Sequence, residues 1–391
     1  MKDYMTLQGL SLVGTYGNRG LTLTEGEGIW LKNPAGDKYM DLMTNYGVNI
    51  FGHGHPEIVA ALSAQLRRLT TLHCSFANDV RADAARALLK RCAGGLSRLY
   101  FSNSGAEAIE AAVKFSVLAT GRKTFIRCGG GYHGKTLGAL SATGGAKYRS
   151  AFEALLLDFV EVPYDDVQAL SSALDGRVAG FFVEPVQGEG GVRPASPGYL
   201  KAAGDLCRAA GALLIVDEIQ TGLGRTGTFL ASEPEGLAYD MVTLAKGLGG
   251  GIPIGATLVS PAVAARIPKA SHTCTLGGNP LAAAGLLASL RVLDDGLISH
   301  VREMGSYFSA RLREAGLPGA LEIRGKGLML GVRVKAGRDL ILKALQGEKI
   351  LACPAGEDVV RFLPPYIIRK PEIDLAMEGI RHAFEASGTE N

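Results

Sequence analysis

The chain has little of what holds small secreted proteins together, binds nucleic acid or crosses membranes. Its six cysteines show no CxxC spacing, which argues against a disulfide framework and a zinc site. Its 41 basic and 38 acidic residues nearly cancel, and no run of lysine or arginine is long enough to follow a nucleic-acid backbone or a membrane surface. No apolar run approaches the ~20 residues of a membrane span, and the N-terminus lacks the apolar core of a signal peptide. We expect a cytoplasmic protein that binds a small molecule and no metal.

Apolar residues and glycine are abundant instead. The chain is 47% hydrophobic, which is enough for a sizeable core, and many of its 53 glycines stand where apolar runs end. From residue 96 to residue 260, short β-type runs alternate with helical patterns such as Ala106–Thr120, which predicts a parallel sheet covered on both faces. The expected strands are Arg98–Phe101, Thr124–Arg127, Gly180–Val183, Ala212–Val216, Met241–Leu244 and Ala256–Val259.

Changes in character along the chain predict three parts. Residues 1–48 contain turns and short strands, including Gly28–Leu31, and form an N-terminal arm or part of a small domain. Residues 49–280 form a large α/β domain, and residues 281–391 a smaller α+β domain. The last part contains expected helices at 281–293 and 301–315 and expected strands at 327–334 and 359–363.

Two strand ends carry polar groups into what we expect to be one crevice, because ligands of an open parallel sheet bind beyond the carboxyl ends of its strands. Lys246 follows one apolar strand and precedes glycine. Asp217 and Gln220 follow another. An amine placed there can form a Schiff base with a carbonyl compound and then act as a general base. A surface lysine and a plain strand end are the alternatives.

A third segment predicts an anion site. Ser104, Gly105 and Ala106 lie between a strand and a helix, so the free N–H groups of the first helical turn would face a phosphate. A plain N-cap, in which Ser104 caps and Glu107 completes a capping box, is a compatible interpretation. Tyr132 and His133 end the next strand-loop unit, and the Tyr132 ring is suited to stacking on a flat ligand.

An amine, a carboxylate, a phosphate cradle and an aromatic wall are what pyridoxal 5′-phosphate (PLP) requires of a protein. Lys246 would hold the cofactor covalently, Asp217 would keep its pyridine nitrogen protonated, and Gln220 would donate to its phenolic oxygen. We therefore predict a PLP site.

A P-loop NTPase is the alternative without PLP. Gly129–Thr136 matches GxxxxGKS/T, and the strand before Asp217 resembles a Walker B strand. That interpretation needs a helix directly after Lys135, but Leu137–Gly145 is short and interrupted by glycine. It also leaves Lys246 without a role.

Taken together, these motifs resemble the class III, ornithine-type PLP aminotransferases, and above all their acetylornithine branch. The resemblance runs almost from end to end, through Gly52–Pro56, Asn103–Ala108, Tyr132–Gly134, Val183–Gly191, Asp217–Gly222, Gly224–Gly227, Lys246–Gly247, Thr275–Pro280 and Arg361–Pro365. It implies fold type I, in which helices sandwich a mostly parallel central sheet and a smaller α+β domain follows. It also implies a homodimer whose two active sites lie at the subunit interface.

The resemblance implies further site residues. Thr275 would reach the phosphate of the neighbouring subunit's cofactor. Arg361 would bind the α-carboxylate of glutamate or 2-oxoglutarate, a task that suits a guanidinium fork. Glu189 would pair with Arg361 while an amine donor is bound, and Glu184 would line the same site.

The implied reaction is transfer of the terminal amine of N-acetylornithine to 2-oxoglutarate, as in arginine biosynthesis. Lys135 stands where relatives that act on ornithine-type donors often carry an arginine that receives the donor's distal carboxylate, and Leu276 replaces a commoner phenylalanine. A lysine keeps the charge but loses the fork. Ornithine, putrescine, 4-aminobutyrate and a carrier-linked lysine therefore remain alternative donors. A PLP aminomutase, which moves the amine within one substrate, is an alternative of another class.

Overall fold

Seven strands form the large sheet of the computed structural model, which describes residues 3–92 and 94–388. In spatial order they are β4 (Arg98–Ser102), β12 (Gly255–Val259), β11 (Met241–Leu244), β10 (Leu213–Asp217), β7 (Val178–Val183), β5 (Thr124–Cys128) and β6 (Phe159–Val162). The prediction missed β6. It was also wrong in treating β12 as parallel, since β12 runs antiparallel to both β11 and β4. Only residues 245–254 join β11 to β12, and a parallel pair needs a longer crossover.

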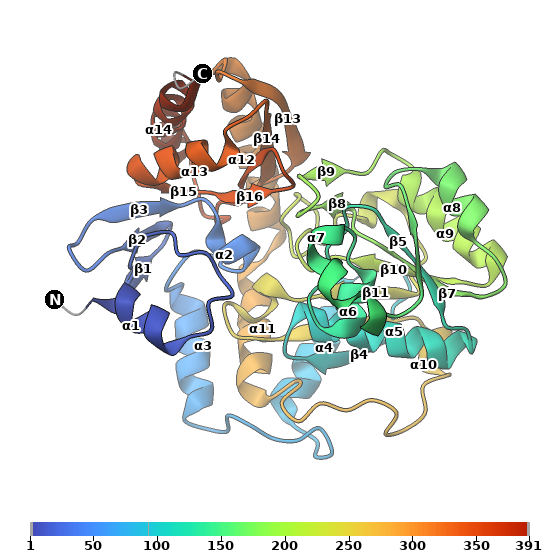
Figure 1. Ribbon diagram of the computed structural model, residues 1–391. Coiled ribbons are helices and arrows are strands. Elements are labelled where there is room, and N and C mark those ends of the chain that lie inside the picture. Colours follow the sequence, from blue (N-terminus) through green and yellow to red (C-terminus); the bar gives the residue numbers. More distant parts are fainter. Residues whose placement is uncertain (1–2, 93, 389–391) are drawn as a thin grey trace.

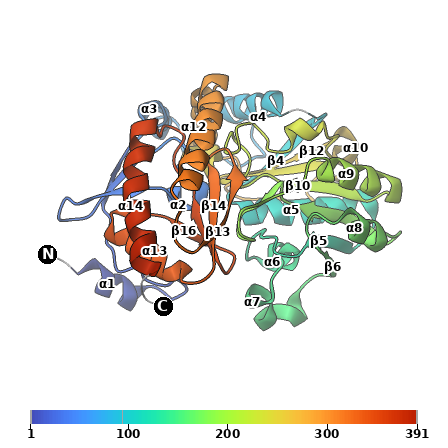
Figure 2. The same cartoon turned by 90° about the horizontal axis from the view of Figure 1, so that it is seen from above.

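Helices cover both faces of this sheet, as predicted (Figure 2). Alternate residues of a strand belong to different cores: Phe181 and Val183 of β7 pack with one, and Phe182 with the other. The surrounding helices are α5 (Gly105–Thr120), α6 (Leu137–Ala142), α7 (Ala146–Arg149), α8 (Val167–Ala173), α9 (Tyr199–Ala210) and α10 (Pro261–Ala264). Gly121 ends α5 in a left-handed conformation with φ 71°, which glycine adopts without strain.

The C-terminal residues build a second layer of sheet and helices. Strands β13 (Ala320–Lys326), β14 (Met329–Val334), β17 (Val359–Phe362) and β16 (Cys353–Ala355) form an antiparallel sheet against α12 (Asp295–Glu314), α13 (Arg338–Gly347) and α14 (Lys370–Gly388). The prediction missed β13 and began the next strand too early. Gly327, with φ 56°, lies in the turn that joins β13 to β14.

The N-terminal strands join the C-terminal part in space (Figure 1). Strands β1 (Glu25–Glu27), β2 (Trp30–Lys32) and β3 (Lys38–Asp41) form one sheet with β15 (Ile350–Leu351). The predicted strand Gly28–Leu31 was wrong in its first half, because Gly28 and Ile29 lie between β1 and β2. Helices α3 (Pro56–Leu66), α4 (Asp79–Arg91) and α11 (Pro280–Val292) pack together below (Figure 1).

The remaining elements are short. They are α1 (Tyr4–Ser11), α2 (Thr44–Gly47), β8 (Val186–Gln187), β9 (Arg193–Pro194) and the 3-10 turns η1 (Ser150–Leu155), η2 (Glu233–Glu235) and η3 (Lys246–Gly249). Among the described residues, no helix combines the length and the apolar character that a membrane span requires.

Candidate active site

Lys246 is the first residue of η3, directly beyond the end of β11. Its φ of 48° is rare for a residue with a side chain and marks a strained position. Within the described chain, its ammonium has no hydrogen bond and no ion pair. Burial lowers the pKa of this amine, while the charges of Asp217 and Glu189 act in the opposite direction. A Cβ placed on Gly47 would lie 3.9 Å from both Lys246 Cδ and Gln220 Cγ, so the structure brings these two predicted residues together.

Asp217 ends β10 and is held on both of its oxygens. His133 Nδ1 donates to Oδ2 at 2.6 Å, and the Ile219 N–H and Thr243 Oγ1 donate to Oδ1 at 2.9 and 3.2 Å. Asp217 is only 3% exposed. Burial lowers the pKa of His133, but its hydrogen bond to Asp217 and that carboxylate's charge outweigh burial and raise it overall. A fixed, buried anion of this kind stabilises positive charge close to it.

The predicted phosphate cradle lies at the start of α5. Ser104 Oγ accepts from the Glu107 N–H at 3.2 Å, and Glu107 Oε2 accepts from the Asn103 N–H at 2.5 Å, close to the predicted capping box. In the part of the chain that the structure describes, the N–H groups of Gly105 and Ala106 bind no protein acceptor. These donors at a helix N-terminus suit an anion.

Arg361 lies on β17 with no exposed side-chain surface. Its Nη2 donates to Glu189 Oε1, its Nη1 to Gln220 Oε1 at 3.0 Å and its Nε to Cys353 Sγ at 3.4 Å. The Glu189 side chain is 24% exposed, so this carboxylate can reach water when it leaves the guanidinium. Cys353 was missed by the sequence analysis, because its contact with Arg361 comes from the pairing of β16 with β17 and from no local motif.

Gln220 lies between Arg361 and a strained turn. Its Nε2 donates to the carbonyl oxygen of Tyr46 at 3.1 Å, and its Oε1 binds Arg361. Residues 44–47 all have left-handed backbones, with φ of 45°, 51°, 57° and 93°. This turn places the Tyr46 ring 5.6 Å from Arg361 Cζ. Gln220 therefore already has protein partners at both ends of its amide, which the predicted bond to a cofactor oxygen did not anticipate.

Glu184 contacts the backbone of Tyr132 and makes no ion pair with Arg361 in the described chain. Its Oε1 accepts from the Tyr132 N–H at 2.9 Å and its Oε2 from the Gly188 N–H at 3.3 Å. Burial raises the pKa of this carboxyl to about 7; His133 lowers it in part and Asp217 raises it.

Lys135 and Thr275 lie at the rim. Lys135 is exposed, with its Nζ 5.3 Å from the centre of the Tyr148 ring, and that ring makes an edge contact with Tyr132 at 5.7 Å. Thr275 is exposed and has no hydrogen bond within the described chain. Its neighbour Cys274 accepts from Asn103 Nδ2 at 3.0 Å, so Thr275 lies close to the segment before Ser104.

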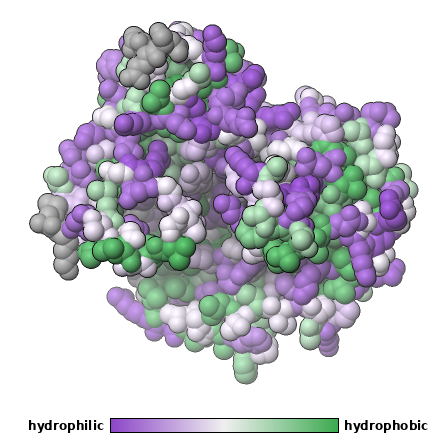
Figure 3. All heavy atoms as spheres, viewed as in Figure 1, coloured by the Kyte–Doolittle hydropathy of each residue, from purple (hydrophilic) through white to green (hydrophobic). Residues whose placement is uncertain are grey.

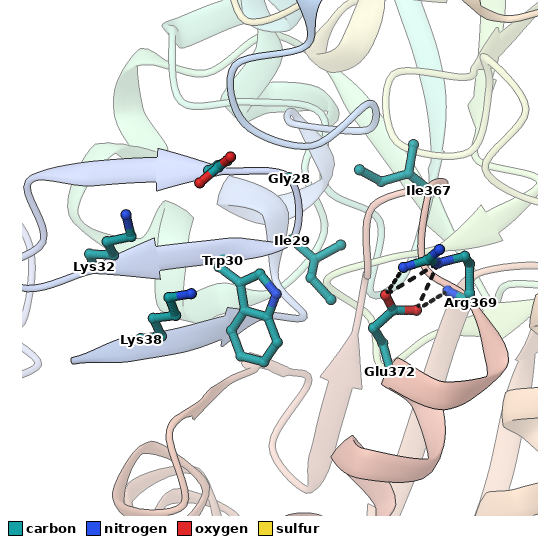
Figure 4. A pocket seen from close by; sticks show the side chains of 9 residues that line it. Gly28, Ile29, Trp30, Lys32, Lys38, Ile367, Arg369 and Glu372 are labelled. Carbon is teal, nitrogen blue, oxygen red and sulfur yellow. Dashed lines mark hydrogen bonds and ion pairs between the residues drawn. The ribbon is translucent and has the colours of Figure 1, made fainter. Parts of the chain in front are cut away.

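The molecular surface is hollowed between the N- and C-terminal elements on one side and the large sheet's elements on the other (Figure 3). A separate open cavity of about 570 Å³ contains none of the predicted residues (Figure 4). Its walls are Glu27–Trp30, Lys32, Lys38, Ile367, Arg369 and Glu372.

Comparison with known proteins gives the family. Residues 15–384 match the family described as aminotransferase class-III. The chain belongs to the class-III aminotransferases. It is 40% identical to acetylornithine aminotransferase of Methanopyrus kandleri over 381 residues, which cover 96% of this chain and 97% of that one.

Two further relatives agree on the family and the fold. The chain is 41% identical to LysW-aminoadipate semialdehyde transaminase of Deinococcus radiodurans over 367 residues, 92% of this chain and 85% of that one. Its fold matches the crystal structure of ornithine aminotransferase from Toxoplasma gondii ME49 with a TM-score of 0.95 and 35% identity, over 100% of this chain and 96% of that one. The predicted fold type I is confirmed.

A class-III aminotransferase depends on PLP, and this chain fits that cofactor. The unpaired Lys246 ammonium, the buried Asp217 carboxylate and the unpartnered N–H groups of Gly105 and Ala106, all within the described residues, could provide the amine, the anion and the phosphate donors that PLP requires. The P-loop alternative is wrong, since α6 after Lys135 is only 6 residues long and the chain belongs to another family.

Proposed function

We propose that this PLP-dependent transaminase takes the terminal amine of N-acetylornithine and passes it to 2-oxoglutarate, giving the semialdehyde and glutamate in a reaction of the arginine-biosynthesis type. The observation that carries the proposal is the Arg361–Glu189 pair beside Lys246. The guanidinium of Arg361 binds the α-carboxylate of glutamate. When the donor has no carboxylate at its reacting end, the carboxylate of Glu189 pairs with the guanidinium instead. One site can thus serve two dissimilar substrates.

When bound, PLP would supply an electron sink for the charge left when the C–H bond of the substrate's amine-bearing carbon breaks. Lys246 would take the proton from that carbon, a task helped by its lowered pKa, since a neutral amine is the base. Asp217 keeps the ring nitrogen protonated, and His133 fixes the orientation of Asp217. The N–H groups of Gly105 and Ala106 would hold the phosphate, and the Tyr132 ring would form a wall of the cofactor site.

Replacing Glu189 with glutamine is expected to change substrate preference. Without the ion pair, Arg361 stays available to glutamate, so its KM falls while the reaction of an uncharged donor chain slows. The ratio of kcat/KM for glutamate over that for the donor should rise roughly 10-fold, equivalent to about 1.4 kcal/mol. Single-turnover kinetics of each half-reaction measure it.

The control for this variant is Asp374→Asn, which removes a carboxylate of α14 that lies 2.9 Å from Arg311. It should leave the ratio unchanged. An equal fall in both half-reactions of Glu189→Gln would show that Glu189 has no gating role.

The identity of the amine donor is supported by the relatives' names and by one rim residue. The Methanopyrus kandleri relative is named for acetylornithine, and the Deinococcus radiodurans relative for a LysW-aminoadipate semialdehyde, which favours a carrier-linked lysine as the second candidate. Lys135 at the rim supplies a single cation for the distal group of the donor, next to the Tyr148 ring. A point charge of this kind suits a carboxylate that stays partly in water.

A panel of single amines tests the donor. Holoenzyme without keto acid is mixed with N-acetylornithine, ornithine, putrescine, 4-aminobutyrate or a lysine-bearing carrier protein, and loss of the visible PLP band is followed. We expect N-acetylornithine to give the largest kcat/KM, by at least about 10-fold, because one wrong or missing contact costs about 1–3 kcal/mol. Putrescine reacting while N-acetylornithine does not would overturn the donor assignment. Glutamate formed from 2-oxoglutarate separates a transaminase from an aminomutase.

The active enzyme is, in this proposal, a homodimer with shared sites. None of the residues of α1 is buried, and Leu10, Leu12 and Val13 are 82%, 61% and 86% exposed. Apolar residues this exposed indicate a surface that a partner covers. Thr275, exposed in the single chain, would complete the phosphate site of the second subunit.

A further inference from the structure

Glu184 joins two loops of the site through one carboxylate. Its two oxygens accept from the N–H groups of Tyr132 and Gly188, which directly precede His133 and Glu189. Glu184 is 7% exposed. Each of its oxygens thus fixes the backbone of one loop.

His133 borders the same buried space. Its Nδ1 is bound to Asp217, while its Nε2 is buried and has no hydrogen-bond partner among the described residues. A Cβ on Gly131 would lie 3.3 Å from His133 Nε2 and 3.7 Å from Glu184 Oε1, so both atoms border one point. A buried polar nitrogen without a partner is rare and calls for a cause.

We propose that Glu184 is a positioning residue whose charge is coupled to that of His133, so that near neutral pH one proton resides on one or the other of them, and that the place of this proton sets the charge next to Asp217. With the proton on His133 Nε2, the imidazolium partly neutralises Asp217. With the proton on Glu184, a neutral imidazole faces Asp217, which then presents its full charge to the cofactor's ring nitrogen. No proton is gained or lost in the exchange. This inference rests on the role proposed above for Asp217.

The other titratable groups around Glu184 do not carry this proton. Tyr164 donates its hydroxyl to the carbonyl oxygen of Glu184 at 3.0 Å, and burial raises its pKa well above the usual value. Burial also raises the pKa of the Cys128 thiol to about 12. Lys246 lies on η3, and burial lowers the pKa of its amine. In the holoenzyme this amine would be bonded to the cofactor. Glu184, whose own pKa is about 7, is left with His133 as its exchange partner near neutral pH.

The test reads His133 directly in the apoprotein. NMR of 13C-labelled histidine follows the seven histidines from pH 5 to 9, and loss of one signal in His133→Asn identifies the residue. In Glu184→Gln the measured pKa of His133 should fall by roughly 1 pH unit, because a nearby negative charge is gone. Glu184→Asp keeps the charge and should keep the pKa close to that of the unmodified protein. In the holoenzyme, Glu184→Gln should also remove a step near pH 7 from the pH titration of the PLP absorption.

Glu110→Gln is the matched control, since Glu110 Oε1 also accepts from two backbone N–H groups, those of Gly138 and Ala139, at 2.8 and 3.4 Å. It should leave His133 unchanged. An unchanged His133 pKa in Glu184→Gln, or equal shifts in the Gln and Asp variants, would overturn the proposal. A shifted His133 pKa with an unaltered PLP titration would leave the shared proton in place and refute the role of Asp217.

Discussion

Lys246→Ala should abolish amine transfer, lowering its rate by about 10⁴-fold or more, because both the covalent hold on PLP and the general base are lost. Among the described residues, no second base stands free at this position. In the described chain, the other charged groups near the Lys246 amine are Asp217, Glu189, Arg361 and Glu184, of which Arg361 is a cation and the others are held by hydrogen bonds. A small added amine should restore part of the rate, since it supplies the missing base.

The same substitution should leave the apoprotein's stability almost unchanged. The ammonium of Lys246 forms no hydrogen bond or ion pair within the described residues, so alanine breaks no polar contact. It removes a desolvated amine, which offsets the methylenes that are lost. We expect the free energy of unfolding to change by less than about 1 kcal/mol. Urea unfolding of the apoprotein measures this, and the visible PLP band measures the loss of cofactor attachment.

Lys343→Ala, which also shortens a lysine of the chain but lies on α13, is the control and should keep both activity and the PLP band. If Lys246→Ala retained more than about one hundredth of the rate, which is the smallest contribution usual for a general base, another residue would have to perform the proton transfer.

The sequence predicted those site residues whose role depends on their own strand end. Lys246, Asp217 and the Ser104–Ala106 segment each stand where a local pattern of apolar run and glycine places them, and the structure puts all three there. Reasoning from local patterns could not predict contacts between segments that are far apart in the sequence. The bonds from His133 to Asp217 and from Cys353 to Arg361 join different strands, and no spacing within one segment encodes them.

The errors in the fold have the same origin. Both faces of strand β12 are buried, so its sequence is as continuously apolar as those of its parallel neighbours. Its antiparallel direction is set by the short connection from β11. Strand β13 was missed because its residues are half-buried or exposed, so its sequence lacks an apolar alternation. The resemblance to a known family supplied Arg361 and Glu189, which no local pattern distinguishes from other charged residues.

Asp217→Asn should reduce the rate of amine transfer by about 10³-fold while PLP still binds. An anion in a buried site stabilises the protonated pyridine by several pKa units, and that protonation makes the ring an electron sink. The amide is nearly the same shape as the carboxylate. Its oxygen can still accept from the Ile219 N–H and Thr243 Oγ1, so the loop after β10 should keep its conformation.

The Asp217→Asn variant also reverses the hydrogen bond to His133. The nitrogen of the new amide would donate to His133 Nδ1, so the imidazole proton moves to Nε2, the atom that has no partner among the described residues. The proton then lies on the nitrogen of His133 that borders the same buried space as Glu184. The combined charge of His133, Glu184 and the side chain at position 217 therefore changes. We expect kcat to fall far more than KM, because the loss acts on proton removal at the substrate carbon and not on binding of its carboxylate.

Asp240→Asn is the matched control for this variant. Asp240 is a partly buried carboxylate whose Oδ2 accepts from the Leu214 N–H at 2.9 Å, at the opposite end of β10 from Asp217. Burial raises its pKa, so an amide is tolerated there. It should leave kcat unchanged within about 2-fold, because the Leu214 N–H can donate to the amide oxygen and Asp240 lies at the other end of the strand from the site. A similar fall in kcat in both variants would assign the effect to the strand, whereas a fall confined to Asp217→Asn assigns it to the charge at the end of β10.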